Sequence, residues 1–438
     1  MTFALSKDTV RQAISAHSAL GLVCCALLYL ICATGTAIVL YEEWQRFEQR
    51  DAPEMTQIAP ANVQRGIENV LASESDGPTT THLYVHLPTE ALPRTTITTD
   101  TQAFHIDAEG TIAVPEENAW AEFLLALHYR LNLPAVIGMS LVGMFGAMLA
   151  ALAISGIVAH PRIFRDAFRL RARRGDDVAT LDWHNRLAVW TLPFALAIAL
   201  TGSMIGLFYI SGSGIAASAY GGDSAAALAP VFGGEPEGDA SPAPVADATP
   251  ALAFMQREYP EVAPYYVILH DPGTAGQHMQ IVGEHPRRLI FGEYYAFSGD
   301  GEFRGTAGMA DGTVGQQLAA STYNLHFGNF GGLPVKIAYI LFGLAMTVVV
   351  ATGTFIWLDK RERRGQRSTM LRGAWWGLVA GVPAGLVATL LARLAIGNTA
   401  PFVPVFWAVC LLAIAACVLR ARQHREPQMP SPQPVPAE

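Results

Sequence analysis

The chain has 438 residues, of which 51% are hydrophobic and 15% are charged, and its formal net charge is −8. Such an apolar composition excludes an ordinary soluble protein, and the acidic balance gives no electrostatic support for nucleic-acid binding. Six apolar runs are long enough to cross a bilayer about 30 Å thick as helices. They are Ile14–Leu40, Ala135–Ala159, Leu187–Ile210, Val335–Leu358, Trp375–Ala392 and Phe402–Leu419. We interpret the first run as a retained membrane helix, because it exceeds a signal-peptide core and lacks a small-residue cleavage site.

Basic residues gather on one side of this six-span alternation. They precede the first span and follow the second, fourth and sixth spans. They are Lys7, Arg11, Arg162, Arg165, Arg169, Arg171, Arg173, Arg174, Lys360, Arg361, Arg363, Arg364, Arg367, Arg372, Arg420, Arg422 and Arg425. The positive-inside rule therefore predicts that these loops and both termini are cytoplasmic.

Two large segments remain on the opposite side of the membrane, at 42–130 and 211–330. Each has a helix-like stretch, ANVQRGIENVLAS or PALAFMQREYP, and later an alternating pattern around a tight turn, AFHIDAEGTIAV or YYAFSGDGEFRG. The alternating patterns predict β-hairpins. We therefore expect two small extracytoplasmic α+β lobes of similar build, the second with a flexible Pro/Ala/Gly/Asp-rich insert at 221–250.

The other predicted regions follow from the spans. We expect the cytoplasmic N-terminus and first helix at 1–41, and the second and third helices with a basic loop at 131–210. The fourth helix is expected at 331–360, and a basic loop with the last two helices at 361–425. A disordered tail is expected at 426–438.

The cysteines exclude two classes of redox site. All five lie within predicted spans, at Cys24, Cys25, Cys32, Cys410 and Cys417. No extracytoplasmic cysteine exists for a disulfide, and no Cys-x-x-Cys-His motif exists for covalent haem attachment. A cysteine quartet for an iron–sulfur cluster is also disfavoured.

Five of the twelve histidines stand at the ends of predicted spans. By the topology above, three lie at the cytoplasmic face and two at the outer face. The cytoplasmic ones are His17, His160 and His184, and the outer ones are His128 and His326. The outer two occur in related contexts, HYRLNLP and HFGNFGGLP, each directly before a span.

Spans one and two look duplicated as spans three and four. His17 and His184 are each followed, seventeen residues later, by Thr-Gly, which is Thr34-Gly35 in one case and Thr201-Gly202 in the other. The second and fourth spans contain Ser155-Gly156 and Thr352-Gly353. This repeat predicts a four-helix bundle with a pseudo-two-fold axis and one histidine for each helix.

Paired histidines at each face suit haem. Two histidines on opposing helices at one depth can ligate one haem iron from both sides, and two such pairs would stack two haems across the membrane. Gly35 and Gly202 each lie eighteen residues beyond their histidine, which is five turns and about 27 Å along one helix face. We expect them to leave room for the flat macrocycle of the opposite haem.

Several alternatives stay open at the level of sequence. A single boundary histidine is usually an interfacial residue, and a non-haem metal site would lack carboxylates, since spans one to four contain none. His160 can replace His17 or His184 as a ligand, donate a hydrogen bond, or be interfacial. We expect His82 and His86, on one face of a strand, to be surface residues. We expect His270, His278 and His285, in turn-rich sequence, to be solvent-exposed.

The sequence resembles the PepSY-associated transmembrane helix family, often described as iron-regulated inner-membrane proteins. The resemblance rests on SAHSALGL with its downstream ATG, ALHYRL, SGIVAHPRIFRDAFRLR, LDWHNRLAVWTLPFALAIALTG, and NLHFGNFGG running to TGTFIWLDKRERR. It covers spans one to four and both outer lobes, which look like PepSY modules. One departure is Ala195, where related sequences often have a histidine after LPF.

This resemblance implies a fold and an activity. The fold would be a mainly α membrane protein, with a duplicated four-helix core, two C-terminal transmembrane helices and two periplasmic PepSY-like lobes. Family members include ferric-siderophore reductases with two haem b groups, which implicates His17, His128, His184 and His326 as axial ligands, with His160 matching a further family histidine. Gly35 and Gly202 join them as expected cofactor-binding residues, and no residue is expected to act as a catalytic acid, base or nucleophile.

The expected function is iron acquisition at the bacterial inner membrane. The protein would be a multi-pass oxidoreductase in contact with membrane lipid, carrying electrons to a ferric siderophore at the periplasmic face and releasing ferrous iron. No flavin or nicotinamide fold fits the sequence, so the donor would be a quinol or a separate reductase. Two alternatives are a PepSY-type peptidase-regulating or ligand-binding protein without redox activity, and a metal or proton transporter.

Overall fold

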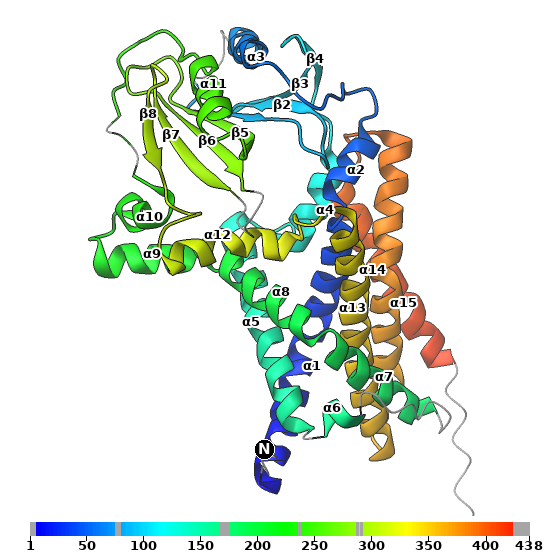
Figure 1. The fold of residues 1–438 in the computed structure, drawn as a ribbon. Helices are drawn as coiled ribbons and strands as arrows, with labels where there is room; N and C mark the ends of the chain where they lie inside the picture. The colour runs from blue at the N-terminus through cyan, green and yellow to red at the C-terminus, as the bar shows by residue number, and fades with distance from the viewer. Residues whose placement is uncertain are drawn as a thin grey trace, which may run out of the picture. The chain divides into compact units, whose positions relative to one another are not determined.

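The computed structural model describes residues 6–74, 80–160, 162–166, 176–234, 236, 238–285, 289 and 292–423 (Figure 1). The predicted tail at 426–438 lies outside these residues. Within the described residues the chain forms two compact units. The first unit takes residues 1–33, 155–190 and 345–438, and the second takes 34–154 and 191–344.

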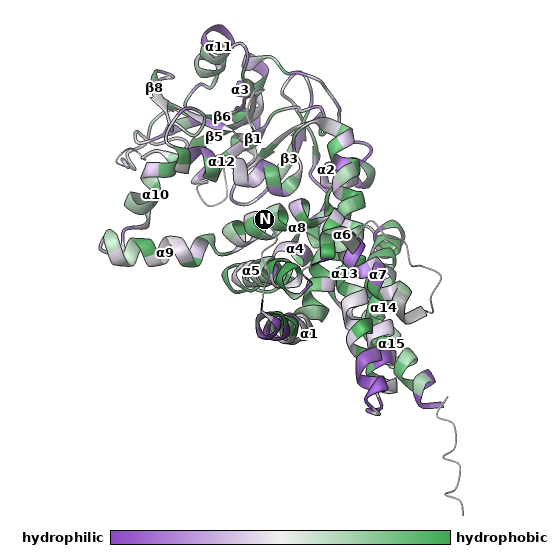
Figure 2. Ribbon diagram, turned by 60° about the horizontal axis from the view of Figure 1, so that its bottom comes forward, coloured by the Kyte–Doolittle hydropathy of each residue, from purple (hydrophilic) through white to green (hydrophobic). Residues whose placement is uncertain are grey.

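Five long apolar helices are able to cross a membrane. They are α1 (Lys7–Ile38), α5 (Ala135–Ala159), α13 (Gly332–Arg363), α14 (Thr369–Ile396) and α15 (Phe402–Gln423). An interrupted pair, α7 (Asp176–Trp190) and α8 (Leu192–Gly206), makes up to six spans if it crosses as one. Figure 2 colours the long helices mainly hydrophobic along their length. The described chain is therefore that of a multi-pass membrane protein.

The third predicted span is wrong in one respect. We expected an unbroken helix over Leu187–Ile210, but α7 ends at Trp190 and α8 begins at Leu192, with Thr191 between them. Pro193 lies in the first turn of α8. Proline lacks an amide hydrogen and disfavours the helical conformation of the residue before it, so a helix running into Pro193 is interrupted there. A second interruption at Leu207 separates α8 from α9 (Phe208–Ala219).

The second unit contains an eight-stranded sheet in the order β4-β3-β2-β1-β5-β6-β7-β8, with every neighbouring pair antiparallel. The strands are β1 (His82–His86), β2 (Thr95–Thr98), β3 (Ala103–Ile106), β4 (Ile112–Pro115), β5 (Ala263–His270), β6 (His278–Glu284), β7 (Glu293–Ser298) and β8 (Phe303–Thr306). The two predicted hairpins are present as β3–β4 and β7–β8.

The two outer segments share one sheet and one core. β1 pairs with β5, which covers an edge that each four-stranded half would otherwise leave open to aggregation. The helices α3 (Pro60–Ser73) and α11 (Thr249–Glu258) supply the rest of a common core. Buried residues from both halves meet there, among them Ile67, Val85, Ile97, Met255, Val267, Ile281 and Phe297. The sequence predicted two separate lobes, and their union is a long-range pairing that no local pattern indicates.

The predicted flexible insert at 221–250 contains ordered structure. α10 (Ser224–Phe232) begins there, and the Asp223 side chain caps it by accepting a hydrogen bond from the Ala226 amide at 3.0 Å. Farther along, Ala246 and Ala248 are buried in the common core. Small apolar residues can pack closely, so an alanine-rich segment that looks unstructured in composition still contributes to the core.

Three shorter helices of the second unit lie between the strands and the long helices along the chain. They are α2 (Tyr41–Glu48), α4 (Ala119–Arg130) and α12 (Val314–Phe327). A further short helix, α6 (Ile163–Asp166), follows α5 in the first unit. α12 begins with a capping box, in which Thr313 and Gln316 exchange side-chain and backbone hydrogen bonds. These connecting helices matter for function because α4 and α12 carry two of the boundary histidines.

We predict that Tyr84→Cys together with Ile268→Cys forms a disulfide on mild oxidation. The Leu87 amide donates to the Tyr265 carbonyl, so the opposed pair Tyr84–Ile268 occupies a non-hydrogen-bonded position with α-carbons about 4.5 Å apart, within disulfide range. A gel shift after maleimide labelling measures the cross-link. In the control, Tyr84→Cys with Ala296→Cys on β7, no cross-link should form. A cross-link in the control, or none in the test pair, contradicts the joined sheet.

Candidate functional site

Two boundary histidines face each other in the second unit. His128 lies in the last turn of α4, and His326 in the last turn of α12. We expected each on a membrane-spanning helix, but both lie on the connecting helix just before one. The cause is local: α4 ends at Leu131 with a left-handed φ of 55°, and α12 ends at Gly328 with a φ of 72°. Each break comes two or three residues after the histidine.

The separation of the two rings fits a shared metal. Their centroids are 6.3 Å apart, and the ring planes differ by 25°. A metal–nitrogen bond of about 2.0 Å plus about 1.1 Å from nitrogen to ring centre puts two imidazoles on opposite sides of one metal about 6.2 Å apart. Among the described residues, no group of three or more His, Cys, Asp or Glu side chains could hold a metal ion. Within the described part of the chain, the candidate ligands at this place are the two facing histidines alone.

Each of these rings is held by a Thr-Gly pair on another helix. His128 Nδ1 lies 3.4 Å from Thr34 Oγ1 of α1, and His326 Nδ1 lies 3.0 Å from Thr201 Oγ1 of α8. The next residue is glycine in both cases. A Cβ atom at Gly35 or Gly202 would lie 2.7 Å from the Cε1 atom of the facing histidine, closer than real contacts allow.

The first unit repeats this arrangement with the other two histidines. His17 Nδ1 lies 3.2 Å from Ser155 Oγ, and His184 Nδ1 lies 3.1 Å from Thr352 Oγ1. Gly156 and Gly353 follow, and their Cβ atoms would lie 3.3 and 3.2 Å from the facing Cε1 atoms. His17 and His184 both belong to the first compact unit.

The structure thus contains four copies of one module. In each, a histidine ring contacts a hydroxyl residue of another helix and the glycine that directly follows that hydroxyl residue in the chain. Gly35 and Gly202 lie against the imidazoles of His128 and His326, whose atoms are the nearest to an added Cβ. Each histidine therefore meets a glycine of another helix, and Gly35, eighteen residues beyond His17, meets a histidine of the other pair. The expected room for a macrocycle at these glycines stays a prediction.

The hydrogen bonds fix which ring nitrogen is free to bind metal. The Thr201 hydroxyl donates to the Ala197 carbonyl at 2.6 Å, and the Thr352 hydroxyl donates to the Val348 carbonyl at 2.7 Å. Each hydroxyl has one hydrogen, so its oxygen accepts from the histidine Nδ1–H. His184 Nδ1 also lies 3.0 Å from the Val349 carbonyl, which can only accept. The proton therefore sits on Nδ1 and leaves the Nε2 lone pair for coordination, the usual outer-shell arrangement of ligating histidines.

Residues 14–360 match the PepSY-associated TM region. The chain belongs to this family. A protein of Pseudomonas aeruginosa described as "Uncharacterized protein PA4219" is 26% identical over 283 residues, which is 62% of this chain and 71% of that protein. All the histidines, hydroxyl residues and glycines of the four modules fall within the family match.

Other histidines of this PepSY-associated chain lie elsewhere. His160 directly follows α5, and its ring makes no hydrogen bond to the described residues. His82, His270 and His278 form a row across β1, β5 and β6, with centroids 5.2 and 4.4 Å apart. The expectation that His278 is solvent-exposed was wrong, since it is 9% exposed. His86 is also not an ordinary surface residue, because burial lowers its pKa to about 4.

Sequence reasoning did not find the hydroxyls as hydrogen-bond acceptors. From the sequence, Thr34, Ser155, Thr201 and Thr352 stand out only as the residues directly before a glycine. The available signal was that a hydroxyl residue precedes the glycine in all four places, and a shared side-chain chemistry points to a shared bond.

Carboxylates surround α4 near His128. The Tyr41 hydroxyl donates to Glu122 Oε1, and burial with this neighbour strongly raises the pKa of Tyr41. Burial, and next the charge of Glu122, raise the pKa of Glu116 to about 7. Glu116 is therefore about half protonated at neutral pH. In the unfolded chain, with a pKa near 4.5, it would be ionised, so Glu116 favours folding at low pH and loses that contribution as pH rises through 7.

We predict that Glu116→Gln melts at a higher temperature than wild type at pH 8 and at the same temperature at pH 4.5. Glutamine mimics the protonated carboxyl, so it removes the cost of a buried charge only where that charge exists. Tryptophan fluorescence of the full chain in detergent measures the melting. Exposed Glu117→Gln is the control and should change neither value. An equal gain at both pH values would contradict the assignment.

Proposed function

We propose that the protein is a dihaem b-type electron-transfer protein of the membrane. The observation that carries this proposal is the fourfold module, in which each histidine Nδ1 faces a hydroxyl; for His184 and His326 this bond leaves Nε2 for a metal. The set contains two pairs, His128 with His326 in one unit and His17 with His184 in the other. Each pair offers two nitrogens, and a haem iron, which already has four porphyrin nitrogens, takes two further ligands.

The residues of the chain would hold and orient the group. When bound, haem supplies reversible one-electron chemistry that the side chains cannot supply. The glycines let the imidazoles approach their helices closely, and the hydroxyls fix ring rotation and tautomer. Hydrogen bonding at Nδ1 also makes Nε2 a better donor, which is one way a protein tunes the potential of an iron centre.

The repeat supports a duplicated core. Thr34-Gly35 of α1 corresponds to Thr201-Gly202 of α8, and Ser155-Gly156 of α5 corresponds to Thr352-Gly353 of α13. We propose that these four membrane helices arose as two copies of a two-helix unit, and that each half of the sheet is a PepSY-like lobe that follows the first helix of its copy. The distribution of basic residues supports cytoplasmic termini in a bacterial inner membrane.

We further propose that the electron acceptor is a ferric siderophore on the periplasmic side. Chelators with hard oxygen ligands hold Fe(III) better than Fe(II), so one electron loosens the metal. The sheet of the second unit and the His128–His326 pair belong to the same compact body, which supports an acceptor near that pair. A quinol, or a separate reductase, would be the donor. One quinol, oxidised to quinone with release of two protons, would reduce two ferric chelates.

We predict that detergent-purified protein contains two non-covalent haem b groups for each chain. His128→Ala and His326→Ala should each remove one haem and deplete the same spectral component. His17→Ala and His184→Ala should deplete the other component, because those histidines form the other pair. Acid–acetone extraction and a pyridine haemochrome assay measure the content. A colourless protein from haem-sufficient cells, or one component lost in both His128→Ala and His17→Ala, contradicts the assignment.

Matched variants sharpen that test. Gly35→Val should deplete the same component as His128→Ala, because its Cβ would lie 2.7 Å from His128 Cε1. Gly214→Val, on α9, should retain both haems, because an added Cβ there would have no atom within 4 Å among the described residues. His160→Ala should also retain both, because its ring makes no hydrogen bond to the described residues.

We predict that dithionite-reduced protein, mixed anaerobically with a ferric hydroxamate or catecholate siderophore, becomes reoxidised and releases Fe(II) to a ferrous trap. The physical reason is the loss of affinity of oxygen ligands for the reduced metal. Visible absorption follows the haem, and the trap follows the iron. Haem that stays reduced with every siderophore but reoxidises rapidly with a quinone would move the function to quinone chemistry.

A further inference from the structure

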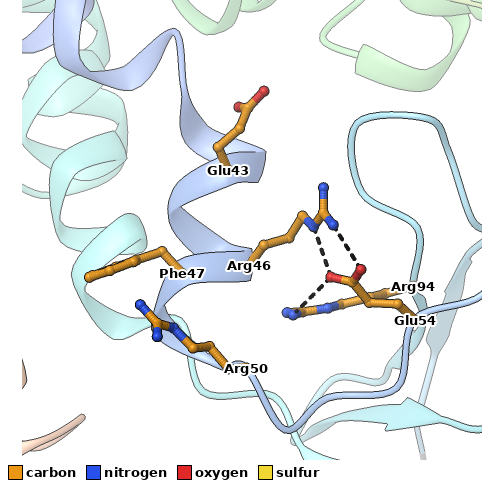
Figure 3. A pocket seen from close by; sticks show the side chains of 6 residues that line it. All are labelled: Glu43, Arg46, Phe47, Arg50, Glu54 and Arg94. Carbon is orange, nitrogen blue, oxygen red and sulfur yellow. Dashed lines mark hydrogen bonds and ion pairs between the residues drawn. The ribbon is translucent and has the colours of Figure 1, made fainter.

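A cavity of about 450 Å³ lies beside α2 in the second unit. Glu43, Arg46 and Phe47 of α2 line it from one side, at the spacing that brings residues to one helix face, and Arg50 joins them from the turn after the helix. Glu54 and Arg94 line it from the other side (Figure 3). Its volume is that of a small-molecule site, and three arginines are an unusual concentration of positive charge in a chain of net charge −8.

The arginines offer more hydrogen-bond donors than the protein accepts. Arg46 forms a two-bond pair with Glu54, at 2.8 and 2.7 Å. Arg94 is 2% exposed and donates from Nη2 to Gln49 O at 2.6 Å, but its buried Nε has no hydrogen-bond partner among the described residues. A guanidinium has five N–H donors, and an unsatisfied buried donor is costly. The arginines around the cavity thus carry more donors than their protein partners accept.

Arg50 supplies the accessible charge. It is exposed, and its guanidinium carbon lies 4.9 Å from the centre of the Phe47 ring. Figure 3 shows Arg50 turned toward Phe47, whereas Arg46 and Arg94 both reach Glu54. Glu54 thus acts as an internal counter-ion for two arginines, and Arg50 has no carboxylate partner among the described residues.

The cavity lies close in the chain to the end of an apolar helix. The first apolar helix, α1, ends at Ile38, and α2 begins three residues later. Trp44 of α2 donates from Nε1 to the Ala37 carbonyl at 2.9 Å, and its ring meets Trp120 edge-on at 5.2 Å. Tryptophans concentrate where a membrane helix meets the headgroup layer, so the arginines next to Trp44 lie where phosphate is abundant.

We propose that this cavity binds a phosphate-type oxyanion, and that its source is the headgroup of an anionic phospholipid. Phosphate oxygens match the planar donor fork of arginine, and basic pockets at the membrane surface bind anionic headgroups. The ligand sits on the exposed Arg50 and on Arg46, whose side chain is 39% exposed, with the counter-ion Glu54 limiting its affinity. The site depends on no haem, and it would fix α2, and the turn after α1, against the bilayer.

Native mass spectrometry of the full chain in mixed detergent–lipid micelles tests the site. Phosphatidylglycerol should be retained in preference to phosphatidylcholine. Arg50→Gln should lower that retention about fivefold, because one basic side chain near an anionic surface contributes about 1 kcal/mol. Glu54→Gln should raise it, because the substitution removes the competing carboxylate. Exposed Arg257→Gln, on α11, is the matched control and should leave retention unchanged.

Inorganic phosphate, titrated alone by calorimetry, separates the two sources of oxyanion. Binding of free phosphate without preference for phosphatidylglycerol would support the oxyanion site and overturn the lipid as its source. Equal retention of both lipids with no phosphate binding would overturn the proposal. So would a loss in Arg257→Gln equal to that in Arg50→Gln, since the effect would then be one of net charge.

Discussion

The bond from a histidine Nδ1 to a helix hydroxyl is the interaction on which this architecture depends. It occurs beside a glycine in four places, at distances from 3.0 to 3.4 Å. A hydroxyl that already donates within its own helix can only accept, so the sequence of one helix decides the tautomer of a ring on another. The glycine is the steric half of the same constraint, because a Cβ there would overlap the imidazole at Gly35 and Gly202 and press against it at Gly156 and Gly353. Neither half works without the other.

The sheet of the second unit solves a different problem. Two four-stranded halves come from segments that are separated in the chain by membrane helices, and each half alone would leave β1 or β5 as an unpaired edge. Pairing β1 with β5 gives one sheet and one core. Buried polar groups of this unit find partners inside it. His105 is hydrogen-bonded to Thr96 and Gln49, at 2.9 and 3.1 Å, and burial lowers its pKa to about 4. The unit is thus a compact body within which His128 and His326 can be positioned.

The sequence predicted the features that are local or periodic. Apolar length located the long helices, alternation around Asp-Gly-type turns located both hairpins, and fixed spacing connected His17 with Thr34-Gly35 and His184 with Thr201-Gly202. It did not predict which partners meet. His17 contacts Ser155-Gly156 rather than a residue of its own spacing repeat, because tertiary packing, and not helix phase, chooses the facing helix. The interruption at Thr191 had a local signal in Pro193, and hydropathy outweighed it.

The four glycine–histidine contacts are not equally tight, and the two tighter ones hold the histidines in the last turns of α4 and α12. At Gly35 and Gly202 an added Cβ would lie 2.7 Å from the imidazole, while at Gly156 and Gly353 it would lie 3.3 and 3.2 Å away. The tighter contacts hold His128 and His326, which stand at the ends of short helices directly before left-handed turns. The looser contacts hold His17 and His184, which lie inside their helices rather than in the last turn. An added side chain would therefore displace the ring at Gly35 or Gly202 more than the ring at Gly156 or Gly353.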